Sequence, residues 1–254
     1  MLITPNRDNL NRIIILNPKG GCGKTTLATN LASYYAVRGP APAVMDCDPQ
    51  GSTMIWIENR PPSNPPIHGI AAYKRTMQAT RSWQLRVPNE TTTLIVDSAA
   101  GLSHDDLRAV TRDASSILVP VLPSSIDIHA ASRCIADLLL VAKIDRRDRK
   151  LAVVANRTRS NTKSFEKLML FLDSLGIPII AVFRDSQNFV HAAEAGIGIC
   201  EMPPHRVRKD IEQLEQVAEW LDDWNNRRSQ RFEGEALDQT SNVTVLHKPK
   251  FTSF

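Results

Sequence analysis

Cysteine is scarce in this sequence, and long apolar runs are missing. The four cysteines lie far apart and none belongs to a CxxC pair, so their spacing indicates neither a disulfide framework nor a zinc site. The six histidines also lack the HExxH spacing of a zinc protease. No apolar run approaches the roughly 18 residues of a membrane-spanning helix, and the polar start MLITPNRDNLNR lacks the apolar core of a secretory signal. We therefore expect a reduced, soluble, cytoplasmic protein.

The composition is that of an ordinary globular protein. Of the 254 residues, 42% are hydrophobic and 23% are charged, which excludes a mostly disordered chain and suits a single large α/β domain. The net charge of +4 is a mild preference for polyanions. Between residues 143 and 163, eight basic residues stand against two acidic ones. Such a segment is either a solvated loop between buried elements or a surface that attracts a phosphate backbone.

Short apolar segments alternate with longer helical patterns along the chain. The apolar segments are continuous runs of Ile, Val and Leu, as expected of parallel strands covered on both faces. Strands are expected at residues 12–17, 43–46, 93–97, 116–120, 151–155 and 178–182, and helices at 24–38, 52–59, 104–113, 126–142, 163–175 and 186–195. This alternation predicts a doubly wound, mostly parallel α/β sheet with helices on both faces. Ligands of such sheets bind beyond the carboxyl ends of the strands.

The alternation is interrupted in two places. The stretch PPSNPP, residues 61–66, opens an insertion that runs from about residue 60 to 92. Near the other end, apolar residues recur at helical spacing and predict a closing amphipathic helix over about 206–224. We expect one domain over residues 1–226 and a mobile polar tail over 227–254.

The most informative segment is the glycine-rich loop between the first strand and the first helix. A strand, a glycine-rich turn, a Lys-Thr pair and a helix in this order predict a phosphate-binding loop. Its backbone N–H groups would converge on phosphate oxygens, and the helix adds its positive N-terminal end. Lys24 would contact the β- and γ-phosphates, and the Thr25 hydroxyl would bind Mg²⁺. The loop therefore predicts a nucleotide with Mg²⁺, and the loop residues that would hold them are Gly20, Gly21, Cys22, Gly23, Lys24, Thr25 and Thr26.

This loop departs from the common GxxxxGK[ST] pattern. Pro18 stands where the first glycine belongs, and Lys19 adds a second lysine. The motif KGGCGKTT resembles the deviant phosphate loop of the ParA/MinD family of ATPases. This resemblance implies that two subunits sandwich the nucleotide and that Lys19 of each subunit reaches the phosphates held by the other. Such a cation supplied in trans would stabilise the charge of phosphoryl transfer, so catalysis would require a homodimer.

Two acidic segments extend the resemblance. DCDPQGS, residues 46–52, resembles the DxDPQG element of ParA proteins, which implies that Asp48 orients or deprotonates the attacking water and that Asp46 lies nearer the metal. The strand that ends in Asp97 resembles a Walker B segment, and Asp97 would hold Mg²⁺ through water. Asn156 ends a later strand, where it is either an adenine-reading amide or a turn residue. The catalytic candidates are thus Lys19, Lys24 and Asp48, and the metal candidates are Thr25, Asp46 and Asp97.

Weaker features indicate the branch of the family. DPQGS and the basic segments favour the ParA branch, in which an ATP-bound dimer binds DNA non-specifically and a ParB-like protein or cargo adaptor stimulates hydrolysis. The resemblance implies a nucleoid-associated ATPase that segregates or positions a plasmid, a chromosome or a microcompartment such as the carboxysome. The last twenty residues show no sustained basic amphipathic pattern, which disfavours the membrane cycling of MinD-like members. The DNA-contact candidates are Arg146, Arg147, Arg149, Arg206, Arg208 and Lys209.

Two other functions are compatible with the same loop. A small-molecule kinase or ATP-dependent ligase of this fold would use the insertion at 60–92 as a substrate pocket, and its activity would not respond to DNA. A binding module would use the nucleotide only as a structural switch. ATPase assays with and without DNA, together with gel filtration in the presence of ATP, separate the three.

Overall fold

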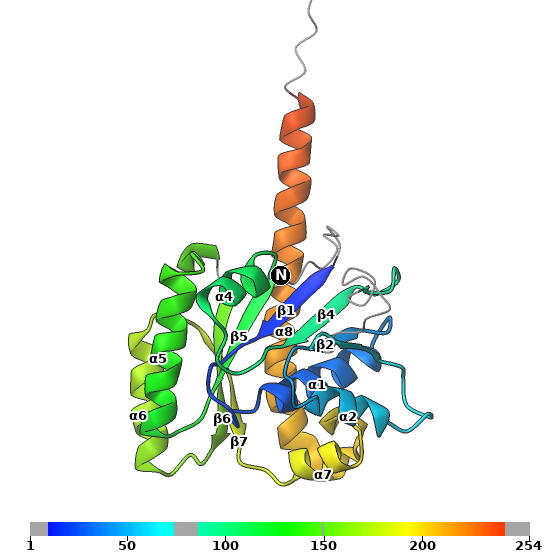
Figure 1. Ribbon diagram of the computed structural model, residues 1–254, viewed down its shortest axis with the longest axis vertical. Helices are drawn as coiled ribbons and strands as arrows, with labels where there is room; N and C mark the ends of the chain where they lie inside the picture. The colour runs from blue at the N-terminus through cyan, green and yellow to red at the C-terminus, as the bar shows by residue number, and fades with distance from the viewer. Residues whose placement is uncertain (1–9, 74–85, 149, 242–254) are drawn as a thin grey trace, which may run out of the picture.

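A parallel sheet forms the centre of the computed structural model, which describes residues 10–73, 86–148 and 150–241, with side chains up to residue 223. The strands are β1 (Asn11–Ile15), β2 (Ala43–Asp46), β3 (His68–Ala71), β4 (Thr93–Asp97), β5 (Ser116–Val121), β6 (Leu151–Thr158) and β7 (Ile179–Arg184). Their order across the seven-stranded sheet is β3-β2-β4-β1-β5-β6-β7, and every neighbouring pair is parallel (Figure 1). The doubly wound α/β fold predicted from the sequence is confirmed.

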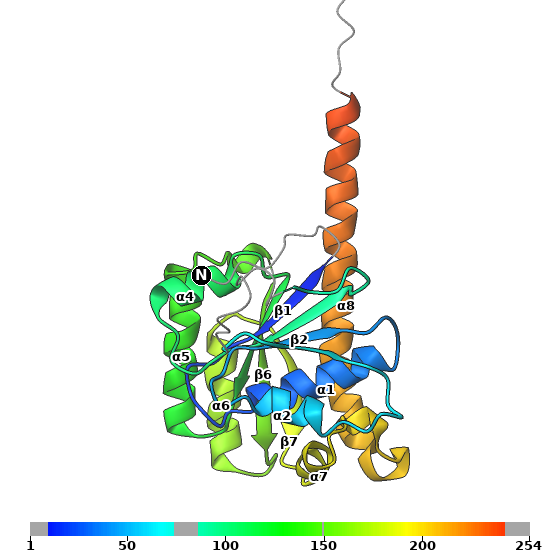
Figure 2. The same ribbon diagram turned by 45° about the vertical axis from the view of Figure 1, so that its right-hand side comes forward.

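Helices cover both faces of this sheet (Figures 1 and 2). On one face lie α4 (His104–Thr111), α5 (Ser125–Leu140) and α6 (Lys163–Ser174). On the other face lie α1 (Lys24–Ala36), α2 (Ser52–Glu58) and α8 (Pro204–Ser241), with α7 (Asn188–Glu194) at the carboxyl edge of the strands. Two short 3-10 turns, η1 (Arg146–Asp148) and η2 (Ile199–Glu201), precede β6 and α8.

The central strand shows why its sequence is apolar throughout. Ile13 and Ile15 pack into the cluster that contains α1 and α8, whereas Ile14 and Leu16 pack into the cluster under α4, α5 and α6. The three isoleucines are fully buried, and burial of a side chain of this size contributes about 1.5–3 kcal/mol. A polar residue at any of these positions would face one core or the other. The continuous apolar run is therefore a direct consequence of helices on both faces.

The same central strand places the phosphate loop at the opening of the sheet. β1 pairs with β4 on one side and β5 on the other, so the loop after β1 emerges at the point where chain order reverses. The Asn17 amide donates a 2.8 Å hydrogen bond to the Pro120 carbonyl and joins the ends of β1 and β5. Ligand sites of open α/β sheets lie at this position.

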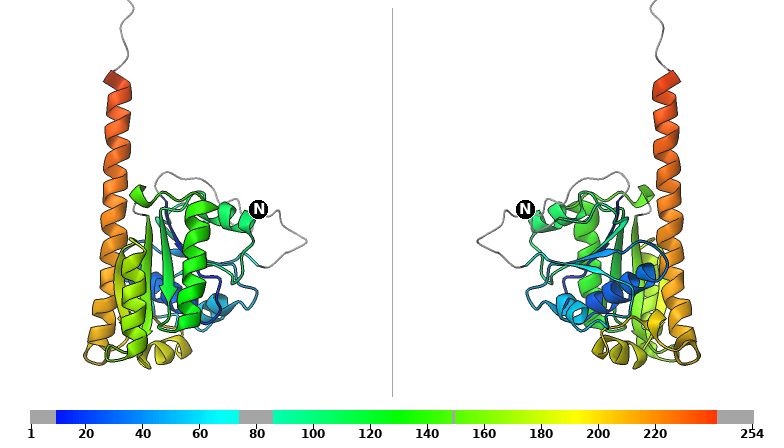
Figure 3. Two further views of the ribbon diagram at one scale, coloured as in Figure 1. Left: turned by 90° about the vertical axis from the view of Figure 1, so that its left-hand side faces the viewer. Right: turned by 90° about the vertical axis from the view of Figure 1, so that its right-hand side faces the viewer.

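Two elements differ from the sequence expectation. β3 lies inside the segment expected to be an insertion and forms the edge of the sheet beside β2; residues 74–85 of that segment are outside the described residues. The closing helix α8 begins at Pro204 and continues to Ser241, past its expected end near residue 224, and its second half projects beyond the domain (Figure 3). The expected tail begins within this helix, and residues 242–254 lie outside the described residues.

The part of α8 that lies on the domain has the expected amphipathic pattern. Val207, Leu214, Ala218 and Leu221 are fully buried against the sheet and α1.

Among the described residues, no helix has both the length and the apolarity needed to cross a membrane.

Candidate nucleotide-binding site

The phosphate loop has the backbone shape that its glycines allow. Gly21 and Gly23 have φ angles of +77° and +98°, in the left-handed region that residues with a side chain rarely adopt. A Cβ on Gly23 would lie 2.1 Å from the Asn156 amide nitrogen. That amide donates a 2.8 Å hydrogen bond to the Cys22 carbonyl and braces the loop from the end of β6. Glycine at position 23 is therefore required by conformation and by the close approach of Asn156.

Lys24 lies at the mouth of the loop with its charge largely buried. Its Nζ donates to the carbonyls of Asn17 at 3.0 Å and Lys19 at 3.1 Å, and the residue is 7% exposed. These partners are neutral, so an anion in the loop would be a stronger partner for the ammonium. The Cys22 thiol donates to the Lys19 carbonyl at 3.3 Å, and burial raises its pKa, so it stays protonated and acts as a packing group.

Lys19 is paired within its own subunit. Its Nζ lies 2.8 Å from Asp127 Oδ1, with the lysine side chain 35% exposed and the aspartate 4% exposed. Asp127 is in the first turn of α5, where its other oxygen accepts from the Ser124 hydroxyl. In this arrangement the amine is held beside its own loop. It has to leave Asp127 before it can contact a phosphate bound in another subunit.

Asp97 and two threonines form a second cluster beside the loop. Asp97 Oδ2 accepts from the Thr25 and Thr53 hydroxyls, both at 2.8 Å. Its Oδ1 is buried without a hydrogen-bond partner among the described residues. Burial raises the pKa of Asp97 to about 6, an effect that hydrogen bonds from Thr25 and Thr53 oppose. A hard cation would satisfy the unpaired oxygen, so the carboxylate and the Thr25 hydroxyl fit a magnesium ion that is also bound by nucleotide phosphates.

Asp46 organises the loop that carries Asp48. Its Oδ1 accepts from the Asp48 N–H at 3.0 Å, and its Oδ2 accepts from the backbone N–H groups of Thr53 and Met54 at the start of α2. Asp46 is fully buried and its pKa is raised by burial. Asp48 itself is half-buried and accepts from the Gln50 N–H at 3.0 Å. Both oxygens of Asp46 are thus bound to the backbone, and its contact with a metal stays a prediction.

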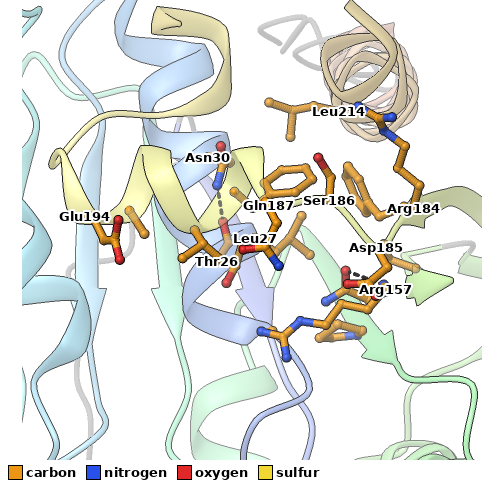
Figure 4. Close-up of a pocket in the computed structure, with 18 residues that line it drawn as sticks. Thr26, Leu27, Asn30, Arg157, Arg184, Asp185, Ser186, Gln187, Glu194 and Leu214 are labelled. Atoms are coloured by element: carbon orange, nitrogen blue, oxygen red, sulfur yellow. Dashed lines mark hydrogen bonds between the residues drawn. The ribbon is translucent and has the colours of Figure 1, made fainter. Parts of the chain in front are cut away.

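A pocket of about 380 Å³ opens beside the loop and is lined by α1, the ends of β6 and β7, and α7 (Figure 4). Phe183 and Phe189 meet edge to face in its wall, with ring centroids 5.7 Å apart. Its polar lining residues come from α1, from the end of β6, from the Arg184–Gln187 turn and from Glu194 of α7. An apolar pocket next to a phosphate loop suits a nucleotide base.

Asn156 lies in this pocket, but its amide is already engaged. Its Nδ2 bonds to the phosphate loop, and its Oδ1 accepts from the Arg157 N–H at 2.9 Å. Arg157 has a φ angle of +48°, a strained conformation for a residue with a side chain. Asn156 therefore supports the loop in this structure, and its contact with adenine stays a prediction.

The DNA-contact candidates do not form one surface. Arg146 and Arg147 lie in η1, just before the amino end of β6, and are called the amino-end group. The helix-start group lies at the beginning of α8, close to α7 and the carboxyl end of the sheet, and consists of Arg206, Arg208 and Lys209. Arg149 lies outside the described residues. The amino-end group thus lies where β6 begins, whereas the helix-start group lies beside α7, where the strands end.

Two residues of this site were not predicted from the sequence. Asp127 and Thr53 are not part of the recognised motifs, yet they bind Lys19 and Asp97. A signal for Asp127 is present in LPSSID, because Ser124 followed three residues later by an acidic residue is typical of a helix start. Thr53 carries no such signal, since only the parallel pairing of β2 with β4 brings α2 next to Asp97.

Comparison with known proteins assigns the family. Residues 13–199 match the CobQ/CobB/MinD/ParA nucleotide binding domain. Two relatives are carboxysome distribution maintenance proteins A: one from Gloeobacter kilaueensis is 30% identical over 84% of this chain and 94% of its own, and one from Halothiobacillus neapolitanus is 25% identical over 81% and 93%. Among solved structures, the ATP complex of a Cyanothece McdA variant shares the fold, with a TM-score of 0.64 and 15% identity over 84% of this chain and 97% of that one. The chain belongs to the ParA/MinD family of nucleotide-binding ATPases.

Proposed function

We propose that this ATPase closes into a homodimer over two ATP molecules, binds DNA non-specifically and positions a cargo along it, with a partner protein stimulating hydrolysis. The observation that carries the proposal is the pair of lysines in one phosphate loop. Lys24 is buried at the mouth of the loop, whereas Lys19 lies at its rim and is partly exposed. A partly exposed cation at the rim is suited to a phosphate outside its own loop. The names of the relatives that maintain carboxysome distribution support a microcompartment as the cargo.

The residues of the site divide the reaction between them. Lys24 and the loop N–H groups hold the triphosphate, and Asp48, half-buried at the carboxyl end of β2, orients the attacking water. Lys19 of the second subunit supplies positive charge to the phosphate oxygens during transfer. Magnesium would be held by the Thr25 hydroxyl and, through water, by Asp97, and when bound it neutralises phosphate charge. Thr25 would exchange its bond to Asp97 for the metal, and the Thr53 hydroxyl, which also donates to Asp97, would hold the carboxylate in place.

Three variants test the dimer and the assigned roles. Lys24→Ala should abolish nucleotide binding. Lys19→Ala should bind ATP but lose turnover, because its contribution comes from the other subunit. Asp48→Ala should accumulate an ATP-bound dimer in gel filtration. A Lys19→Ala protein that hydrolyses ATP at the wild-type rate as a monomer would reject the sandwich. DNA-independent phosphorylation of a metabolite would instead favour the small-molecule kinase.

The DNA proposal is tested by comparing the two basic groups. Each group has one arginine that is already paired, Arg147 with Asp145 at 2.7 Å and Arg208 with Glu212 at 3.1 Å. We expect the amino-end group to bind DNA, because the surrounding residues 143–163 carry eight basic residues against two acidic ones, whereas acidic residues recur along α8 beside the helix-start group. Changing Arg146, Arg147 and Arg149 to Glu should weaken binding of unrelated duplexes equally and lower the salt dependence by about one ion for each phosphate that is no longer neutralised. The same change at Arg206, Arg208 and Lys209 is the control. Loss of binding only in the control would move the DNA-binding surface to the start of α8.

A further inference from the structure

The helix that follows the Asp48 loop is anchored at both of its ends. At its beginning, the backbone N–H groups of Thr53 and Met54 bind the carboxylate of Asp46, which also binds the Asp48 N–H. A shift of α2 would therefore move the loop that carries Asp48. Because α2 has only seven residues, it has little freedom to bend between its ends.

The other end of α2 is bound by a buried ion pair. Arg60 makes two hydrogen bonds to the Glu201 carboxylate, one through Nη1 at 2.9 Å and one through Nη2 at 2.5 Å. The two side chains are 6% and 5% exposed. Arg60 also donates through Nε to the Pro65 carbonyl at 3.0 Å, and Glu201 accepts from the Gly198 N–H at 2.8 Å. Trp56 adds a second connection, since its indole N–H donates to the Ile197 carbonyl at 3.2 Å.

The segment that receives these bonds, residues 196–201, is called here the strap. It extends from α7, because the Ile197 N–H donates to the Ala192 carbonyl at 3.0 Å. It also contacts α1, because the Ile199 N–H donates to Asn30 Oδ1 at 2.7 Å. Both α7 and Asn30 line the pocket beside the phosphate loop, as Figure 4 shows for Asn30 and Glu194. The strap thus joins the wall of the pocket to the far end of α2.

The approach between strap and helix leaves almost no space. A Cβ on Gly196 would lie 2.5 Å from the Asn59 carbonyl oxygen, and Gly196 has a φ angle of +65°. Backbone packed against backbone in this way transmits a displacement directly, because there is no flexible side chain to absorb it.

We propose that Arg60 and Glu201 are positioning residues that couple occupancy of the base pocket to the placement of Asp48. This rests on the proposed function of Asp48. A buried ion pair contributes little net stability, because desolvation of both charges offsets their attraction. A paired, two-bond geometry does fix the direction of the two segments relative to each other. A base that fills the pocket would contact α7 and Asn30, which hold the strap, and the ion pair would convey their displacement to α2 and the Asp48 loop.

Two conservative variants test the coupling. Arg60→Lys keeps the charge but loses the two-bond geometry, and Glu201→Gln keeps the acceptor for Gly198 while it removes the charge. Because misplacing a catalytic group by about 1 Å costs up to 100-fold, we expect kcat for ATP to fall about 10- to 100-fold. The dissociation constant for MgATP should change by less than about threefold, because neither residue lines the pocket. Trp56→Phe should act in the same direction by a smaller factor.

A destabilised control separates coupling from general loss of structure. Leu221→Ala removes a buried side chain of α8 far from the strap and should cost about 2–5 kcal/mol of unfolding free energy. Urea unfolding curves show which fraction of each protein is folded at the assay temperature, and kcat is expressed per folded chain. Turnover as low in Leu221→Ala as in Glu201→Gln would overturn the proposal, as would unchanged kcat or a weakened MgATP affinity that accounts for the loss. A wild-type protein without ATP hydrolysis would instead reject the proposed role of Asp48.

Discussion

Replacing Asp127 with asparagine tests the resting position of Lys19. Lys19 Nζ lies 2.8 Å from Asp127 Oδ1, and the aspartate is almost completely buried. For Lys19 to reach a phosphate in the second subunit, the ion pair with Asp127 has to break. The buried Asp127 carboxylate is then left without its cation. Asparagine has the same shape but no charge, so it holds the lysine less tightly. We therefore expect Asp127→Asn to favour the closed dimer.

The size of the effect follows from the exposure of the pair. A partly exposed ion pair contributes about 0.2–1 kcal/mol, and because the aspartate is only 4% exposed we take the upper end of this range. Each dimer releases two lysines, so the change is about 2 kcal/mol per dimer, or roughly 30-fold in its dissociation constant.

The assay is sedimentation velocity over a series of protein concentrations, with Mg²⁺ and a non-hydrolysable ATP analogue. Asp145→Asn is the matched control, because Asp145 also accepts from a cation, Arg147 at 2.7 Å, but this pair is exposed and precedes β6 at the other end of the sheet. The control should leave the dissociation constant unchanged. An equal or weaker dimer in Asp127→Asn would show that the intramolecular pair does not restrain Lys19.

Three further changes have outcomes fixed by local contacts. Gly23→Ala should abolish nucleotide binding in calorimetry, because the new Cβ would lie 2.1 Å from the Asn156 amide nitrogen that braces the loop. The control is Gly176→Ala, because Gly176 also has a positive φ angle but its Cβ would lie 4.0 Å from the nearest atom, the end of the Arg146 side chain. This control should lose about 1–2 kcal/mol of stability and bind nucleotide normally. Thr53→Val should lower the urea unfolding free energy by about 1–3 kcal/mol, since Asp97 loses a buried donor; an unchanged value would mean that water replaces the hydroxyl. Burial raises the pKa of Asp210, but its hydrogen bonds outweigh this and hold the pKa below its usual value, so the carboxylate stabilises the fold fully above that usual value and progressively less as the pH falls below it. Asp210→Asn should accordingly destabilise the protein at neutral pH and by less in acid; a constant difference in thermal unfolding would contradict this.

Most strands of the sheet could be predicted because each one is encoded by the residues of a single short segment. Each run of Ile, Val and Leu reports a strand with helices on both faces, and six expected strands correspond to β1, β2, β4, β5, β6 and β7. β3 could not be found in this way. Its sequence HGIA has one glycine and one alanine among four residues, and it becomes a strand because β2 offers it a partner. The pairing of β3 with β2 exists only in the folded sheet and cannot be predicted from the sequence of β3 alone.

The residues of the candidate site also fall into those that lie within one segment and those that only folding brings together. The phosphate loop is one continuous segment, so the sequence shows that its glycines and lysines are neighbours. Lys19 and Asp127 are more than a hundred residues apart, and only the meeting of β1 and β5 joins them. The contacts of Asp46 were equally hidden, because an acidic residue at a strand end binds either a metal or the next helix start. Here its oxygens accept backbone N–H groups of the Asp48 loop and α2.

The length of α8 gives the molecule a long lever. Near its base, Asp210 is fully buried and binds Arg184 at the end of β7, next to the pocket. From there the helix continues to Ser241 and leaves the domain (Figure 3). The helix stays packed on the domain as far as Leu221, so only the part beyond this residue is free to swing. With a rise of 1.5 Å per residue, a change of about 5° in the direction of α8 at Leu221 displaces its end by roughly 3 Å, more than the rearrangement that causes it.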